Sequence, residues 1–323
     1  MIPFSPPRID QKVIDEVVDT LKSGWITTGP KTKEFERRLT AYCGNKATLA
    51  VNSNTVGLEV VLRWFGVQEG DEVIVPAYTY CATANVIVHC GAKPVMVDVN
   101  ADDFDVCLEK VREAITDKTK VIMPVDLGGM PCAYDELFEL VETEEVKTLF
   151  QAKTEEQGKL GRILILSDSA HSIGAEYKGR KAGCLADVSV FSFHAVKNLT
   201  TAEGGAIMLN LPEPFDNEEV YRYLCTYTLH GQNKDALAKT KKGAWRYDVL
   251  VSGFKGNMTD IMASIGLVEL SRYEDDTLHY RKCIYDQYTD AFSRYGWAEL
   301  PIYETEDRKS SYHVYCLRVK GIT

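Results

Sequence analysis

One lysine of this sequence stands in an unusual place for a charged side chain. Lys197 follows the apolar run 188–193 in a nearly uncharged segment, and a second apolar run, 206–209, comes soon after it. A lysine between two buried strands loses part of its solvation, which favours the neutral, nucleophilic amine. Most single lysines are solvated surface charges. This position instead predicts a lysine that forms a covalent bond with an aldehyde.

An aspartate follows another apolar run. Asp168 comes two residues after 163–166, in the sequence Ser-Asp-Ser-Ala-His that ends at His171. A carboxylate at the tip of a buried strand is costly unless a cation meets it. A protonated ring nitrogen would be such a cation. A simple role as a helix or turn cap is equally open for Asp168 alone.

A candidate phosphate site follows the apolar run 47–51. Residues 52–57 read Asn-Ser-Asn-Thr-Val-Gly and open a predicted helix that reaches about Phe65. Free amides at a helix N-terminus bind anions, although the same residue types are also ordinary helix caps. Ser192, five residues before Lys197, can add a hydroxyl. A phosphate site, an acid for a ring nitrogen and a lysine for an aldehyde together predict one ligand, pyridoxal 5′-phosphate.

The elements that must position these residues follow from the hydrophobic pattern. Seven short apolar runs alternate with longer amphipathic stretches. The runs are 47–51, 72–75, 94–99, 121–125, 163–166, 188–193 and 206–209. Near-continuous apolar strands separated by helices predict an α/β fold, with a mostly parallel central sheet sandwiched by helices. Ligands of such sheets bind at the carboxyl ends of the strands, where all three candidate segments lie.

The remaining elements flank this sheet. A helix is predicted between the cap Asp10 and the stop Gly24. The charged stretch 134–162 is predicted to be a mostly helical, solvated excursion. A helix beginning at 257 and a tyrosine-rich helical region lead to one strand-like run, 312–319.

Two domains are expected. A cofactor-binding large domain would span 1–255. Linking helices and a small, shortened C-terminal domain would span 256–323.

Composition excludes several classes of protein. The 323 residues carry 37 Lys and Arg against 47 Asp and Glu, a net charge of −10, which argues against nucleic acid or an anionic membrane as a partner. The longest uncharged run, 73–92, contains proline, asparagine and histidine and is a poor membrane span. Nine scattered cysteines without a C-x-x-C pair, and an N-terminus without a signal-peptide pattern, predict a cytoplasmic protein.

Taken in order, these motifs resemble the DegT family of sugar-nucleotide aminotransferases, a branch of the fold-type I pyridoxal-phosphate enzymes. The matching segments are 23–30, 53–57, 76–83, 91–95, 168–171, 192–197, 203–205 and 253–260. They run from the N-terminal part of the chain towards its last predicted strand. Within the family, 24–30 and 192–198 are most similar to the enzyme that makes UDP-4-amino-4-deoxy-L-arabinose.

The resemblance implies a role for each matching residue. Lys197 would hold the cofactor covalently and move protons, Asp168 would pair with the ring nitrogen, and His171 would lie near the ring hydroxyl. Tyr80 would stack on the ring. The phosphate would be held by the helix start, namely Asn54, Thr55 and Val56. Ser192 and Asn257 would add two side chains, and Asn257 would come from the second subunit. Three residues are weaker substrate-site candidates, namely Trp25, Thr28 and His194, although packing beside the lysine is the more favoured role for His194.

The implied reaction is transfer of an amino group from L-glutamate to a keto sugar on a nucleotide, a UDP-4-keto sugar, by a ping-pong route that releases 2-oxoglutarate. The implied assembly is a homodimer with a shared active site. Three departures stand out. Asn54 takes a place where family members often have a small residue. The charged stretch before Ile163 is longer than is usual in the family. Family chains also continue beyond the strand that here ends at Val319.

Other functions stay open. Family dehydratases replace the lysine with histidine, so Lys197 argues against a sugar dehydratase. The shortened C-terminal domain keeps an inactive cofactor-binding protein possible. A nicotinamide oxidoreductase is disfavoured because no G-x-G-x-x-G follows a strand. A metal-dependent hydrolase is disfavoured because the six histidines form no ligand-spaced cluster.

Overall fold

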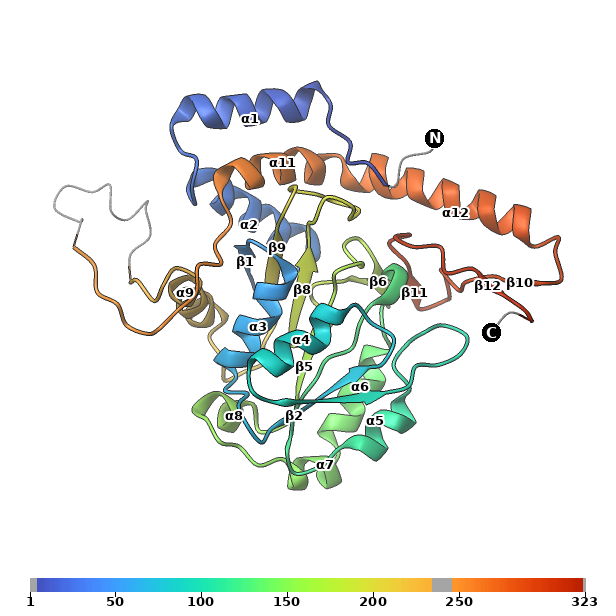
Figure 1. Cartoon of the computed structure of the whole chain (residues 1–323), viewed down its shortest axis with the longest axis horizontal. Coiled ribbons are helices and arrows are strands. Elements are labelled where there is room, and N and C mark those ends of the chain that lie inside the picture. The colour runs from blue at the N-terminus through green and yellow to red at the C-terminus, as the bar shows by residue number, and fades with distance from the viewer. Residues whose placement is uncertain (1–4, 234–245, 322–323) are drawn as a thin grey trace.

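A computed structural model describes residues 5–233 and 246–321 of the chain (Figure 1). Its centre is a seven-stranded sheet in the order β1-β9-β8-β5-β4-β2-β3. Neighbouring strands are parallel except in the two pairs that β9 makes, with β1 and with β8. The expected α/β fold with a mostly parallel sheet is therefore confirmed.

All seven predicted strands are present, with ends that shift by at most three residues. They are β1 (Ala47–Val51), β2 (Glu72–Pro76), β3 (Lys93–Val97), β4 (Thr119–Ile122), β5 (Leu164–Asp168), β8 (Val188–Ser192) and β9 (Gly205–Leu209). The most useful difference concerns β5, because Asp168 is its last residue rather than a residue beyond it.

Side chains alternate between two buried clusters on the two faces of the sheet. In β2, Ile74 belongs to one cluster, while Val73 and Val75 belong to the other. The first cluster is covered by α2 (Pro30–Cys43), α5 (Leu108–Ala114), α6 (Tyr134–Glu142), α7 (Glu144–Leu149) and α11 (Asp260–Ser271). The second is covered by α3 (Asn54–Trp64), α4 (Cys81–His89) and α9 (Asn217–Tyr227). Both faces are thus buried, as the near-continuous apolar strands require.

The N-terminal helix α1 (Gln11–Ser23) has the caps that the sequence predicts. Asp10 accepts a hydrogen bond from the backbone amide of Val13, and Gly24 ends the helix at a φ of 79°. The helix packs against α11, and both lie at the top of the molecule in Figure 1.

The stretch 134–162 is helical but not simply solvated. It folds into α6, α7 and α8 (Glu155–Leu160), and the inner face of α6 buries Tyr134, Leu137 and Leu140. The prediction of a solvated excursion was wrong on this point, because the charged residues that suggested it occupy only the outer face. An amphipathic helix against a sheet requires that division.

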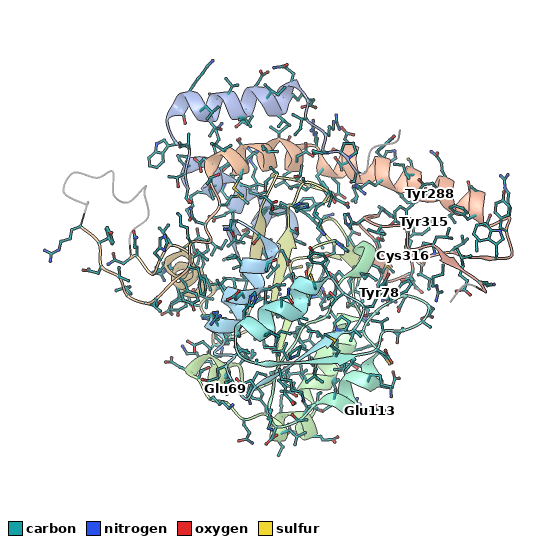
Figure 2. The ribbon with its side chains drawn as sticks, viewed as in Figure 1. Glu69, Tyr78, Glu113, Tyr288, Tyr315 and Cys316 are labelled. Carbon is teal, nitrogen blue, oxygen red and sulfur yellow. The ribbon has the colours of Figure 1, made fainter. Side chains whose placement is uncertain are left out.

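The C-terminal segment is not the single strand predicted for 312–319. It follows α12 (His279–Phe292), and only the short strands β10 (Ala298–Glu299), β11 (Arg308–Lys309) and β12 (Arg318–Val319) pair. Between β11 and β12 the backbone amides of Ser311 and His313 bond instead to the carbonyls of Gly129 and Gly128. Figure 2 labels Tyr288 of α12 and Tyr315 of this segment, whose ring centroids lie 5.3 Å apart.

The expected division into 1–255 and 256–323 stays a prediction. Parts of both ranges, including the N-terminal residues 1–4, lie outside the described residues. Within those that are described, no helix has both the length and the apolar character needed to cross a bilayer.

Candidate active site

The buried acid of the site lies at the carboxyl end of β5. Asp168 is 5 % exposed and accepts three hydrogen bonds. They come from the Thr83 hydroxyl (2.8 Å), the Asn54 amide (3.1 Å) and the Ala170 backbone N–H (3.3 Å). Burial raises the pKa of Asp168, whereas these three donors and the positive charge of Lys197 oppose the rise. The three neutral donors do not neutralise the charge of the Asp168 carboxylate, so the site suits a cationic partner.

Lys197 lies in the turn that connects β8 to β9. Its backbone N–H bonds to the carbonyl of His194 (2.9 Å), which fixes the turn. Burial lowers the pKa of the Lys197 amine, and the negative charge of Asp168 opposes that shift. The two predicted residues are thus brought into one electrostatic environment, and the lowered pKa favours the nucleophilic form of the amine.

The predicted phosphate site is the start of α3. The Ser53 hydroxyl caps the helix by accepting from the Val56 backbone N–H (3.2 Å). The amides of Asn54 and Thr55 precede the first helical hydrogen bond and have no partner within the helix. A Cβ at Gly205 would lie 2.6 Å from the Asn54 nitrogen, so this glycine lets the helix start approach β9. Ser192 is the last residue of β8 and pairs with Gly205.

A histidine that the sequence analysis did not single out joins the site. The rings of His171 and His313 lie 4.3 Å apart. His171 Nδ1 accepts from the Gly128 backbone N–H (3.3 Å), and His313 Nδ1 bonds to Asn198 Oδ1 (2.7 Å). The Asn198 amide nitrogen donates to the Ser311 carbonyl, so its oxygen must accept from His313. His171 Nδ1 therefore carries no proton, whereas His313 Nδ1 carries one.

Burial and nearby positive charge explain why both rings stay neutral. Burial together with the charge of Lys197 lowers the pKa of His171 to about 3. Burial, His171, Lys197 and Arg281 lower the pKa of His313 to about 2. No local sequence pattern predicts His313 here, because its position depends on Gly128 and Gly129, far away in the chain.

Tyr80 has the exposure that a stacking role requires. It precedes α4 and is 76 % exposed, so its ring face is open to a planar ligand. Its neighbour Thr79 bonds to Thr83 (2.8 Å), the residue that donates to Asp168. The loop before α4 is thereby connected to the buried acid.

Of the substrate-site candidates, Thr28 contacts Asn257, and Trp25 lies beside Gly29, where an added Cβ would lie 2.9 Å from its ring. The Thr28 hydroxyl accepts from the Asn257 amide (2.6 Å), and Asn257 forms a β-bridge with Val51, just before α3. Asp260 holds the same loop, because its carboxylate accepts from the backbone N–H groups of Gly29 (2.7 Å) and Thr32 (2.9 Å). Asp260 was not predicted, since its role depends on a contact between distant segments.

His194 begins the turn that holds Lys197, because its carbonyl accepts the Lys197 backbone N–H. Its side chain is 47 % exposed, and Nε2 lies 3.6 Å from the Glu203 carboxylate. The favoured packing role of His194 stays a prediction. The alternative role near the substrate stays a prediction.

The residues present suit pyridoxal 5′-phosphate. A buried carboxylate can meet a protonated ring nitrogen, unpaired helix amides can hold a phosphate, and a partly desolvated amine can meet an aldehyde. Elsewhere in the described ranges, 5–233 and 246–321, no group of three or more His, Cys, Asp or Glu side chains is placed to hold a metal ion.

Comparison with known proteins decides the family. The model of the DegT/DnrJ/EryC1/StrS aminotransferase family matches residues 7–322. The chain belongs to this family. The structure of a putative sugar aminotransferase of the family's fold, Spr1654 from Streptococcus pneumoniae, superimposes with a TM-score of 0.95 in its PMP-form. It is 51 % identical, over 99 % of this chain and 79 % of that one.

Further relatives extend the DegT/DnrJ/EryC1/StrS resemblance. The PLP-form of Spr1654 matches with a TM-score of 0.93 and 49 % identity, over 99 % of this chain and 78 % of that one. The spore coat polysaccharide biosynthesis protein SpsC of Bacillus subtilis is 34 % identical, over 98 % of this chain and 76 % of its own length. The uncharacterized protein MJ1066 of Methanocaldococcus jannaschii is 40 % identical over 84 % of this chain, which spans 65 % of that relative.

Proposed function

We propose that this chain is a pyridoxal 5′-phosphate-dependent aminotransferase that transfers an amino group from L-glutamate to a keto sugar on a nucleotide. The observation that carries the proposal is the convergence of Asp168, Lys197 and the start of α3 at one edge of the sheet. PMP-form and PLP-form structures of Spr1654 support the choice of cofactor. The resemblance of 24–30 and 192–198 to the aminoarabinose enzyme supports a UDP-4-keto sugar as acceptor, and the scattered cysteines support a cytoplasmic location.

When bound, the cofactor supplies an electron sink that stabilises negative charge on the substrate carbon. Asp168 then keeps the ring nitrogen protonated by accepting its hydrogen bond. Lys197 Nζ would hold the cofactor aldehyde covalently and, as a free amine, would take the proton from the substrate carbon and deliver it to the cofactor carbon that carries the amino group. The first-turn amides of α3 and the Ser192 hydroxyl hold the phosphate, and the ring of Tyr80 excludes water from one side.

The two half-reactions of a ping-pong route can be observed separately. The purified chain, incubated with pyridoxal 5′-phosphate and freed of excess, is expected to show a visible absorption band. L-glutamate alone should remove this band, and a UDP-4-keto sugar should then restore it. A band that ignores glutamate would contradict amino transfer and favour a dehydratase or an inactive cofactor-binding protein. No band at all would contradict the proposed cofactor.

We also propose that the chain is a homodimer in which Asn257 serves the phosphate site of the second subunit. Helix α1 exposes Ile14 (44 %), Val18 (39 %) and Leu21 (53 %) on one apolar face, which a second copy would cover. The bridge from Asn257 to Val51 leaves open the alternative that Asn257 serves its own chain.

Mixing two inactive variants separates these alternatives. If Asn257 acts across the interface, a heterodimer of Lys197→Ala and Asn257→Ala has one site with both defects and one intact site. Co-expression of differently tagged chains should then recover about half of the wild-type activity per isolated heterodimer. Recovery near zero would mean that Asn257 serves its own chain. A single-chain mass in sedimentation would contradict the dimer itself.

A further inference from the structure

The side chain of Asn54 does not point where a phosphate ligand should. Its backbone amide belongs to the predicted phosphate site, but its side chain is buried, with the residue only 8 % exposed. The side-chain Nδ2 donates to Asp168 Oδ1 (3.1 Å) and to the carbonyl oxygen of Val190 (2.7 Å). Both N–H groups of this amide are therefore used, one on β5 and one on β8.

Two glycines make this contact possible. A Cβ at Gly205 would lie 2.6 Å from the backbone nitrogen of Asn54, and a Cβ at Gly57 would lie 2.5 Å from a side-chain carbon of Val190. Real Cβ atoms do not approach so closely, so the start of α3 sits against β8 and β9 only because these residues are glycines. This close approach puts the Asn54 amide within reach of the carboxylate.

We propose that Asn54 is a positioning residue that joins the start of α3 to Asp168 and keeps the phosphate-binding amides and the buried carboxylate at a fixed separation. The inference rests on the proposed function, because a short –CH2–O– link joins the phosphate of pyridoxal 5′-phosphate to its ring and confines the separation of phosphate and ring nitrogen to a narrow range. A small residue, which family members often have here, makes no such connection. Asn54 acts through Asp168 and the helix start.

Replacing Asn54 tests this connection with matched variants. Asn54→Ala removes both donors, whereas Asn54→Asp keeps the shape and puts a second carboxyl group beside Asp168. Asn210→Ala is the control, because Asn210 also donates to a backbone carbonyl, that of Cys184 (3.0 Å), but lies beyond the far end of β9. The first measurement is the affinity of each cofactor-free chain for pyridoxal 5′-phosphate, followed by absorption between pH 6 and 8.5.

Asn54→Ala is expected to weaken binding roughly 10- to 100-fold, because it removes a hydrogen bond to a charged group. Asn54→Asp should bind weakly at high pH and recover as the pH falls, since two adjacent carboxyl groups then share a proton that bridges them. Asn210→Ala should bind like the wild type. Wild-type affinity in Asn54→Ala, or an affinity of Asn54→Asp that equals the wild type at every pH, would overturn the inference.

A second measurement decides the inference without the cofactor. Hydrogen–deuterium exchange of the cofactor-free chain should rise in Asn54→Ala both at 54–57 and at 168–170, but not in Asn210→Ala. Unchanged exchange in either segment would show that Asn54 does not join them. A wild-type chain that fails to bind pyridoxal 5′-phosphate would defeat the proposed function, while the exchange result would still decide whether Asn54 connects the two segments.

Discussion

Lys197→Ala is expected to lower the rate of amino transfer by at least about a thousandfold. The variant loses the covalent attachment of the cofactor and also the amine that moves the proton, and each contribution alone is worth a factor of about 100 or more. Turnover with L-glutamate and a keto sugar nucleotide measures the loss. A rate within tenfold of the wild type would rule out the role proposed for Lys197.

A chemical measurement on the same variant does not depend on turnover. Reduction of the cofactor-loaded wild type with borohydride should attach the cofactor permanently to Lys197, which mass spectrometry of the digested chain detects. Lys197→Ala should show no attachment. Lys178→Ala is the matched control, because Lys178 lies at the surface in an ion pair with Asp135 (2.7 Å) and should keep both attachment and activity. Attachment at another lysine would contradict the assignment.

The cofactor-free chain is expected to lose stability as the pH falls from 7 to 5, by about 2 kcal/mol for each of two histidines. The pKa values of His171 and His313 in the folded chain are lowered to about 3 and about 2. In the unfolded chain both titrate near pH 6.5. Below pH 6.5 the unfolded chain therefore binds protons at both histidines that the folded chain does not bind. The contribution of these two histidines to the free energy of unfolding therefore falls across this interval and continues to fall until about pH 3.

Burial raises the pKa of Asp105 to about 6, so this carboxyl group stabilises the folded chain as the pH falls and opposes the effect of the histidines. A comparison between variants therefore isolates the contribution of the histidines. The double variant His171→Asn, His313→Asn should lose less stability than the wild type between pH 7 and 5, measured by urea unfolding. Equal pH slopes in the double variant and the wild type would show that the rings are not held neutral.

The parts of this site that the sequence predicts are those set by local pattern. An apolar run followed by a polar residue marks the end of a buried parallel strand, and the edge of the sheet brings such ends together. This is why Asp168, Ser192 and the start of α3 lie at one edge as expected. Lys197 was recognisable because a cation in an uncharged segment between two strands has few alternatives.

The parts that the sequence does not predict depend on contacts between distant segments. His313 occupies the site because backbone groups of Gly128 hold it, and Asp260 holds the loop at Gly29 from 231 residues away. The side chain of Asn54 turns to Asp168 because two glycines let the helix approach. None of these arrangements leaves a local pattern, since each depends on which segments the fold places side by side.

The contact between His171 and His313 also has a consequence for synthesis of the chain on the ribosome. Asn198 and its partner His313 are 115 residues apart. At about 5–20 residues per second, roughly 6–23 s pass after Lys197 and Asn198 have been made before His313 exists. During this interval the nascent chain already has its lysine, its acid and its helix start, but it lacks the ring that packs on His171. Cofactor capture by the growing chain would therefore meet a more open and more hydrated site than the finished protein offers.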